Sequence, residues 1–271
     1  MTPDRVPPPP PRYRALLRNV GRVPEVFRCL RVSPDWASHI LTYVGLARPT
    51  FPRDFRTRSG DTLSLESFTD LVTAWIIYCR REYTVLSSDR VIVDAGANIG
   101  AFSLYAARRA PLAKIVALEP FPETRRLLTK TVAANKLADR VEIRDWALAG
   151  DDSRRMMDLG TGDEPSQSRG MFPAGAQDGV AVNAVSLATF LRRENLTKVD
   201  LLKMDIEGSE HEVFAGADNE TLRHFARISL EYHPNKPWAR LFARLEAAGF
   251  RLRRDLPAGP DSGVAELELG I

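Results

Sequence analysis

Short runs of β-branched and apolar residues alternate with amphipathic segments from residue 90 to the end of the chain. Runs of this kind are typical of buried parallel strands, and the segments between them carry apolar residues at helical spacing. The pattern predicts strands at 91–93, 114–118, 141–145, 200–204 and 226–232, with a final pair at 250–254 and 264–269. It predicts helices at 100–109, 122–135, 209–215 and 236–248. We therefore expect an α/β fold with a doubly wound, mostly parallel, seven-stranded sheet.

Two connections depart from this alternation. Residues 257–263, between the last two predicted strands, are too few for a helical crossover, so we expect an antiparallel edge strand. Residues 160–179 are rich in Gly, Pro, Ser and Asp. Long segments of this composition inside a domain usually serve function or are disordered, and we interpret this one as a substrate-facing flap.

The first 85 residues follow a different pattern. Apolar residues at steps of three and four predict helices at 34–47 and 67–83, and alternation on both sides of Ser59-Gly60-Asp61 predicts a hairpin at 54–65. The proline run at 7–11 is expected to be extended. We divide the chain into an N-terminal extension and lid at 1–85, with 1–12 disordered, and a main domain at 86–271.

Composition narrows the function classes. With 271 residues, 44% of them hydrophobic, the chain can bury a sizeable core. A net charge of +3 is too small to predict a nucleic-acid surface. Cys29 and Cys79 form no disulfide or zinc pattern, and no apolar run reaches the ~18 residues of a membrane span. We expect a cytoplasmic protein with no nucleic-acid or membrane partner. Assembly into a homo-oligomer remains an open alternative.

The first candidate site follows the strand predicted at 91–93. That strand runs into Asp94 and a turn containing Gly96, Asn98 and Gly100. A ligand can lie close against the backbone at Gly96, and Gly100 lets the first helical turn pack tightly on the sheet. Asp94 would repel a pyrophosphate and attract a cationic ligand. This turn therefore favours S-adenosylmethionine over a dinucleotide.

The second predicted strand supports the same interpretation. Glu119 stands at its carboxyl end, where an acid can accept hydrogen bonds from both hydroxyls of a ribose. Counted from Gly96, the second and third glycine positions of the dinucleotide pattern are occupied by Asn98 and Ala101. The pair of signals favours S-adenosylmethionine over NAD.

Further acidic residues follow the later strands. The strand at 200–204 ends in Asp205, and the strand at 226–232 contains Glu231, with His233 two positions beyond it. Glu231 and His233 point to one face of an extended chain. Because ligands of open α/β sheets bind at the carboxyl ends of strands, we expect Asp205, Glu231 and His233 to gather beside Gly96 and Glu119.

These motifs resemble those of the FkbM-type methyltransferases, a family of the S-adenosylmethionine-dependent Rossmann-like superfamily. The resemblance covers roughly residues 55–235 and rests on Val93-Asp94-Ala95-Gly96-Ala97-Asn98-Ile99-Gly100, Leu118-Glu119-Pro120, Lys203-Met204-Asp205-Ile206-Glu207-Gly208-Ser209-Glu210 and Glu231-Tyr232-His233. It implies a class I Rossmann-like methyltransferase fold. It also implies O-methylation of a hydroxyl on a small molecule such as a natural product or sugar.

The resemblance further implies roles for single residues. Asp94, Gly96 and Asn98 would flank the methionine part of the cofactor, and Glu119 would hold the ribose. Trp146 would contact the adenine or serve as an ordinary core aromatic. The predicted cofactor-binding residues are Asp94, Gly96, Asn98, Gly100, Glu119, Trp146 and Asp205.

Two mechanisms fit the acidic cluster. In the first, His233 is the general base and Glu231 or Asp205 orients its ring. In the second, Asp205, Glu231 and His233 bind Mg²⁺ or another divalent metal that acidifies the hydroxyl. The alternatives to a methyltransferase are an NAD-dependent oxidoreductase and a cofactor-binding scaffold without catalysis.

Overall fold

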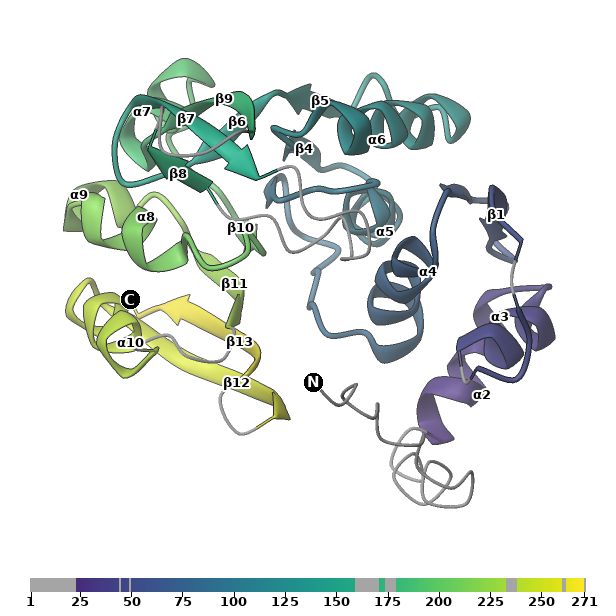
Figure 1. Cartoon of the computed structure of the whole chain (residues 1–271). Coiled ribbons are helices and arrows are strands. Elements are labelled where there is room, and N and C mark those ends of the chain that lie inside the picture. The colour runs from purple at the N-terminus through teal and green to yellow at the C-terminus, as the bar shows by residue number, and fades with distance from the viewer. Residues whose placement is uncertain are drawn as a thin grey trace, which may run out of the picture.

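The centre of the computed structural model is one seven-stranded sheet (Figure 1). Its strands are β3 (Val91–Ala95), β4 (Lys114–Leu118), β5 (Val141–Arg144), β10 (Leu201–Met204), β11 (Arg227–Tyr232), β12 (Phe250–Gly259) and β13 (Ser262–Leu269). They lie in the order β12-β13-β11-β10-β3-β4-β5. The structure describes residues 23–43, 45–48, 50–158, 171–173, 179–232, 238–259 and 262–270. Each predicted strand is present, and the predicted fold class is confirmed.

The antiparallel part of the sheet differs in one detail from the prediction. Every pairing within the group β3, β4, β5, β10 and β11 is parallel. In contrast, β13 is antiparallel to both of its neighbours, β11 and β12. The antiparallel strand is therefore second from the edge, and β12 forms the edge itself.

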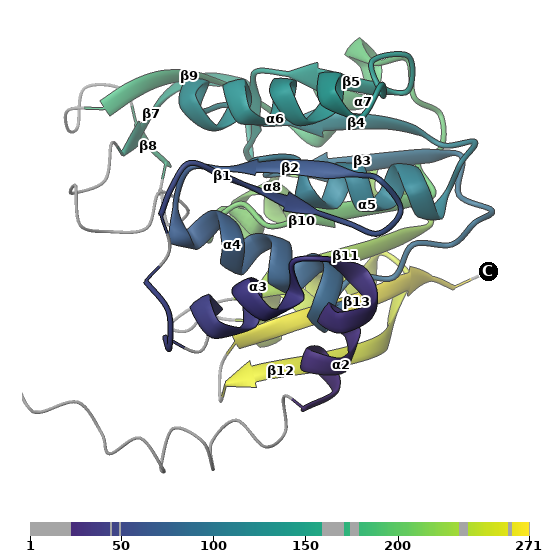
Figure 2. The ribbon, with the colours of Figure 1, turned by 90° about the vertical axis from the view of Figure 1, so that its right-hand side faces the viewer.

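Helices cover both faces of the sheet (Figure 2). One face carries α5 (Ala101–Arg109) and α6 (Pro122–Ala134), whose apolar residues share a buried cluster with Ile92. The other carries α7 (Leu187–Arg193), α8 (Glu210–Gly216), α9 (Asn219–Leu222) and α10 (Trp238–Ala247), which pack in a second cluster with Val93. Alternate residues of one strand thus enter opposite cores, as the pleat requires.

The N-terminal elements pack on the α5 side. They are α2 (Val23–Val32), α3 (Trp36–Tyr43), the hairpin β1 (Arg53–Arg56) and β2 (Thr62–Leu65), α4 (Phe68–Trp75) and the five-residue π-helix η2 (Ile76–Arg80). The hairpin forms around Gly60 as predicted. Ser67 and Asp70 form a capping box that starts α4. The disorder expected at 1–12 lies outside the described residues, and the division at residue 85 stays a prediction.

A second, four-stranded sheet is absent from the predictions. It contains β6 (Trp146–Leu148), β7 (Ser153–Asp158), β8 (Met171–Pro173) and β9 (Gly179–Val185), in the order β6-β9-β7-β8. The flap expected at 160–179 falls largely outside the described residues.

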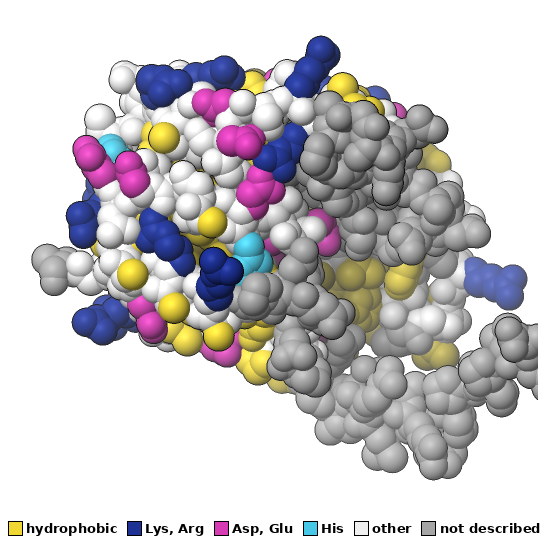
Figure 3. Space-filling model, turned by 60° about the vertical axis from the view of Figure 1, so that its left-hand side comes forward, with side chains coloured by type: hydrophobic (Ala, Val, Ile, Leu, Met, Phe, Trp, Pro, Cys, Tyr) yellow, Lys and Arg dark blue, Asp and Glu magenta, His cyan; other side chains and the backbone are white. Residues whose placement is uncertain are grey.

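Charged side chains of both signs are interspersed on the face that comes forward from the left of Figure 1, where α8 and α9 lie (Figure 3). Hydrophobic side chains are scattered among them on this face. In the part of the chain that the structure describes, no helix is both long enough and apolar enough to cross a membrane.

A close contact between two strand ends lies at Gly96. Its φ is +74°, and a Cβ built there would stand 1.8 Å from the backbone oxygen of Asp205. The turn after β3 therefore touches the segment after β10, and only a residue without a side chain fits between them.

Replacing Gly96 by Ala is expected to destabilise the protein severely. Gly60→Ala is a matched control, because Gly60 also has a positive φ, +90°, but a Cβ at that position would have nothing within 4 Å of it. We expect Gly96→Ala to cost about 2–4 kcal/mol more than Gly60→Ala in denaturant unfolding. Equal losses in the two variants would contradict this role of the contact.

Candidate active site

A pocket opens at the carboxyl ends of β3, β4, β10 and β11. Its walls come from the turns that follow these strands and from η2 and β6. The predicted site residues that line it are Gly96, Asn98, Glu119, Trp146, Asp205 and Glu231. The strand ends thus meet where the topology of an open α/β sheet predicts a ligand.

The backbone of the glycine turn is already hydrogen-bonded within the protein. The N–H groups of Gly96 and Ala97 donate to the carbonyl of Leu118 at 3.1 and 2.9 Å. The N–H of Asn98 donates to Glu119 Oε2 at 2.8 Å, and that of Gly100 donates to the Ala97 carbonyl at 2.8 Å. These four donors are the groups with which a glycine-rich turn binds phosphates. Their occupation disfavours a pyrophosphate in this turn.

Asp94 lies beneath the turn and not in the pocket lining. Its side chain is fully buried and forms an ion pair with Lys203 Nζ at 3.2 Å. It also accepts a hydrogen bond from the Ser103 hydroxyl at 2.7 Å. The electrostatic role that the sequence assigned to Asp94 needs correction, because Lys203 offsets its charge before any ligand arrives.

Gly100 also lies behind the pocket. It caps α5 with a φ of +85°, and a Cβ there would stand 2.7 Å from Leu128 Cδ1. The close packing that the sequence predicted is present, but the partner is α6 and not the sheet.

Asn98 lies in the pocket wall with a positive φ of 49°. Its Oδ1 is shielded from solvent and accepts no hydrogen bond from the described part of the chain. A buried acceptor of this kind is costly unless a ligand or water satisfies it. Asn98 is therefore placed to bind a hydrogen-bond donor.

Glu119 is held rigidly at the end of β4. Its Oε1 accepts from the Phe121 N–H at 3.0 Å and the Thr124 hydroxyl at 3.2 Å, and its Oε2 accepts from Asn98. Burial raises the pKa of Glu119, while these hydrogen bonds oppose the rise. A carboxylate has about four acceptor positions, so one remains on Oε2. A contact with both hydroxyls of a ribose would require Thr124 to turn to the Phe121 carbonyl, which lies 3.3 Å away.

Trp146 lies half-buried at the start of β6, where its ring lines the pocket. The guanidinium carbon of Arg193 lies 5.2 Å from the ring centroid, and that of Arg144 lies 6.0 Å away. Cations at these distances fix an aromatic ring by cation–π attraction. Contact with an adenine stays a prediction.

The structure brings Asp205 and Glu231 together. Both side chains line the pocket, and their carboxyl groups lie within hydrogen-bonding reach of each other. Burial, followed by the charge of Asp205, raises the pKa of Glu231 to about 10. Glu231 therefore keeps its proton at neutral pH.

His233 lies outside the described residues, so its predicted role as base or ligand is not tested. Within the described ranges, no three His, Cys, Asp or Glu side chains are grouped in a way that could hold a metal ion. The proposed metal set needs His233 as its third member and stays a prediction.

The model of the methyltransferase FkbM domain matches residues 94–252. The chain belongs to the FkbM methyltransferase family. Its resemblance to that family is thus confirmed over the segment that carries Gly96, Glu119, Asp205 and Glu231.

The chain is also similar to curated proteins, one of which is named as a methyltransferase. The chain is 31% identical over 199 residues to methyltransferase sdnD of Sordaria araneosa, covering 63% of this chain and 77% of that protein. It is 29% identical over 209 residues to the AMB antimetabolite synthetase AmbE of Pseudomonas aeruginosa, covering 64% of this chain but 10% of the synthetase. This match therefore covers only a small part of that larger protein.

The fold matches a solved FkbM structure. The methyltransferase FkbM from Methylobacillus flagellatus KT is 12% identical, with a TM-score of 0.50 over 94% of this chain and 60% of that chain. At this identity the likeness concerns the fold alone, and the present chain spans less than two thirds of its solved relative.

Several pocket residues of this FkbM protein were not among the predicted site residues. Lys203 lies between Asp94 and the pocket, and Tyr83 and Phe121 supply aromatic walls. Glu207 also lines the pocket and has a φ of +59°, a strained value for a residue with a side chain. Burial raises the pKa of Glu207 to about 8. The run from Lys203 to Glu210 contained this signal, because three acids there follow one strand end.

Glu210 of this run is expected to make stability fall with rising pH. Its side chain is fully buried, and burial raises its pKa from 4.5 to about 7. Between these values the native state binds more protons than the unfolded state, so stability falls as pH rises through that window. Glu210→Gln keeps an oxygen to accept from the Ile206 N–H, which lies 3.1 Å from Oε1.

In denaturant unfolding, Glu210→Gln should make the slope of stability against pH shallower by up to about 1.4 kcal/mol per pH unit between those two pKa values. Glu246→Gln, on the exposed side of α10, is the control and should leave the slope unchanged. An unchanged slope in Glu210→Gln would show that Glu210 does not hold a proton in the native state.

Proposed function

We propose that this FkbM protein binds S-adenosylmethionine in the pocket and uses it to methylate a hydroxyl group of a small molecule. The observation that carries the proposal is the gathering of carboxyl groups in the pocket, where the raised pKa values of Glu207 and Glu231 would fall if a cation were bound beside them. Glu119, Asp205, Glu207 and Glu231 line the pocket, whereas Lys203 is its one cation among the described lining residues and is paired with Asp94. Such a pocket favours a cationic ligand over a phosphate.

The residues present fit the proposed cofactor. Asn98 Oδ1 offers a free acceptor for a donor such as an amino group, and Glu119 Oε2 offers one acceptor position for a ribose hydroxyl. Trp146 and Phe121 provide flat apolar surface for an aromatic base. When bound, S-adenosylmethionine supplies an electrophilic methyl group on a sulfonium. NAD fits less well, because the N–H donors of the glycine turn are occupied.

The acceptor side is proposed to take a neutral hydroxyl. Ile76 and Ile77 of η2 and Tyr83 line the same pocket as Asp205 and Glu231. Apolar walls exclude water and help align oxygen, methyl group and sulfur, while the carboxyl groups can accept hydrogen bonds from hydroxyls. The relative named as an antimetabolite synthetase supports a small-molecule acceptor.

Proton removal is proposed to fall to His233. An aliphatic hydroxyl is a poor nucleophile until it loses its proton, and a neutral imidazole near pH 7 can accept it. Asp205 and Glu231 together hold a negative charge at the pocket that would stabilise the imidazolium formed.

The free thiols of Cys29 and Cys79 support the proposed cytoplasmic location.

Calorimetric titration tests the choice of donor. We expect micromolar binding of S-adenosylmethionine and S-adenosylhomocysteine, with no binding of NAD. Glu119→Ala should weaken S-adenosylmethionine at least about tenfold, because a charge-assisted hydrogen bond contributes roughly 1.5–3 kcal/mol. Glu123→Ala, exposed on neighbouring α6, is the control and should bind normally. Binding of NAD alone would replace the methyltransferase proposal by an oxidoreductase.

Methyl transfer to a panel of hydroxyl compounds tests the base. His233→Ala should lower kcat by ~10²-fold or more while the affinity for S-adenosylmethionine changes little. His224→Ala is the control, since the His224 ring bonds the Thr197 carbonyl at 2.7 Å, away from the pocket lining. Full turnover of His233→Ala would remove this residue from the mechanism.

A further inference from the structure

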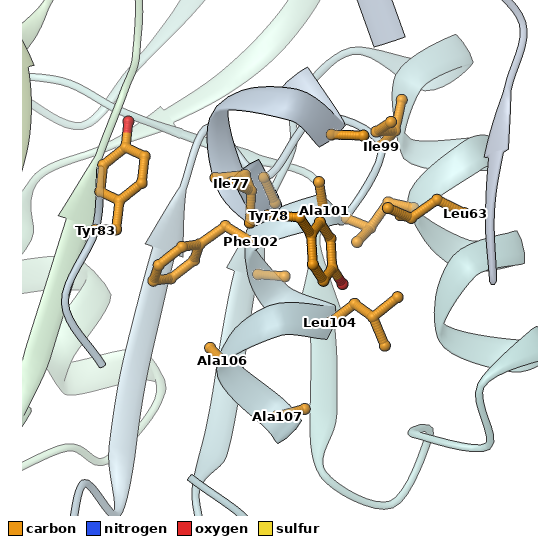
Figure 4. Packing of buried hydrophobic residues seen from close by; sticks show 14 of the residues in the cluster. Leu63, Ile77, Tyr78, Tyr83, Ile99, Ala101, Phe102, Leu104, Ala106 and Ala107 are labelled. Atoms are coloured by element: carbon orange, nitrogen blue, oxygen red, sulfur yellow. The ribbon is translucent and has the colours of Figure 1, made fainter. Parts of the chain in front are cut away.

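A second hollow, of about 250 Å³, lies on the other side of η2 from the methyl-donor pocket. Ile76 and Ile77 of η2 line the donor pocket, and Tyr78, the next residue, lines the hollow. Figure 4 shows that the side chains of Ile77 and Tyr78 point to different sides of η2, with Ile77 on the side of Phe102 and Tyr78 beside Leu104. The rest of the wall comes from α2, the β1–β2 hairpin and α5.

Guanidinium groups dominate this hollow. Arg31, Arg58, Arg108 and Arg109 line it, against a single carboxylate, Asp61. That carboxylate is 1% exposed and already accepts from Arg108 Nε at 2.6 Å and from the Ser59 hydroxyl at 3.0 Å. Four arginines and one carboxylate leave the lining with an excess of three positive charges. Asp61 is already counted in this excess and cannot offset it further.

The other arginines have few partners in the protein. Arg58 donates through Nε to the Leu30 carbonyl at 3.1 Å. Arg31 and Arg109 make no side-chain hydrogen bond or ion pair within the described ranges of the chain. These side chains are exposed, and an anion bound between them would reduce the repulsion that solvent only partly screens.

Tyr78 provides an independent indication of a ligand. It is 7% exposed, and its hydroxyl is shielded from solvent with no hydrogen-bond partner in the described part of the chain. Burial, followed by the charge of Asp61, raises the pKa of this hydroxyl, so it remains a donor at neutral pH. An orphaned buried hydroxyl costs free energy that a hydrogen-bonding ligand would recover.

We propose that the hollow lined by Arg31, Arg58, Arg108, Arg109 and Tyr78 is a binding site for a phosphate monoester. A phosphate group near pH 7 carries close to two negative charges and three strong acceptor oxygens. Guanidinium forks match those oxygens in pairs, and the Tyr78 hydroxyl adds a neutral donor. The volume is below that of typical drug-sized pockets, and it suits a phosphate with a small attached group.

Binding of inorganic phosphate and of glycerol 3-phosphate by the full chain, at constant ionic strength in chloride, tests the site. The double variant Arg31→Ala/Arg109→Ala should weaken both at least about tenfold, since it removes two charge-assisted contacts. Arg223→Ala/Arg240→Ala removes two exposed arginines elsewhere and is the charge-matched control. Tyr78→Phe should also weaken binding, without loss of stability in the absence of phosphate.

The outcomes separate the site from general attraction. No phosphate binding by the native protein, or equal weakening in both double variants, would overturn the proposal. Cosedimentation with phosphatidylcholine vesicles with and without phosphatidic acid identifies the source of the phosphate. Vesicle binding that depends on Arg31 and Arg109 would show that the phosphate belongs to a lipid headgroup. Absence of vesicle binding would show that the phosphate belongs to a soluble ester. None of these readouts depends on methyl transfer, so failure of the methyltransferase proposal would leave the results unaffected.

Discussion

The buried ion pair between Asp94 and Lys203 is the constraint on which the active site depends. The two residues are directly opposite each other on β3 and β10, and both are almost completely buried. Burial alone would lower the pKa of Lys203, but Asp94, Asp205 and Glu231 more than offset it and raise that pKa. Lys203 also donates to the Gly96 carbonyl at 2.8 Å. Because either charge without its partner would be costly, the pair fixes the height of the glycine turn above the sheet.

The pocket above this pair concentrates more acid than the protein can ionise at once. Burial and mutual repulsion raise the pKa of Glu207 to about 8 and that of Glu231 to about 10, next to Asp205. Such crowding lowers the stability of the native state and is retained most often at functional sites. A ligand that brings positive charge into the pocket would relieve the repulsion. The same arrangement therefore accounts for the strain among these carboxyl groups and for the proposed preference for a sulfonium.

The sequence predicted the strands whose apolar pattern is contained within the strand itself. The strand at 114–118 has the predicted bounds, because a continuous apolar run flanked by polar residues has one interpretation in an α/β chain. The sheet of β6 to β9 was missed, since β7 mixes two arginines with two methionines and pairs with a strand near residue 184. The ion pair of Asp94 was not predicted for a similar reason, because its partner Lys203 lies far along the chain on β10 and no local pattern identifies that contact. Glu119 lies at the carboxyl end of its strand as expected, and its contact with a ribose stays a prediction. Its three protein donors could not be inferred from the sequence.

The closeness of Gly96 to Asp205 has a consequence for how the protein folds. Their contact joins segments more than a hundred residues apart, and the pocket also needs strand ends from β4 and β11. Contacts of such long sequence separation pay a large loop-closure entropy and tend to form late. Partly folded chains would hold their helices and hairpins before they hold a binding site. Ligand recognition is thus a property of the completed sheet, acquired in one step with its cooperative assembly.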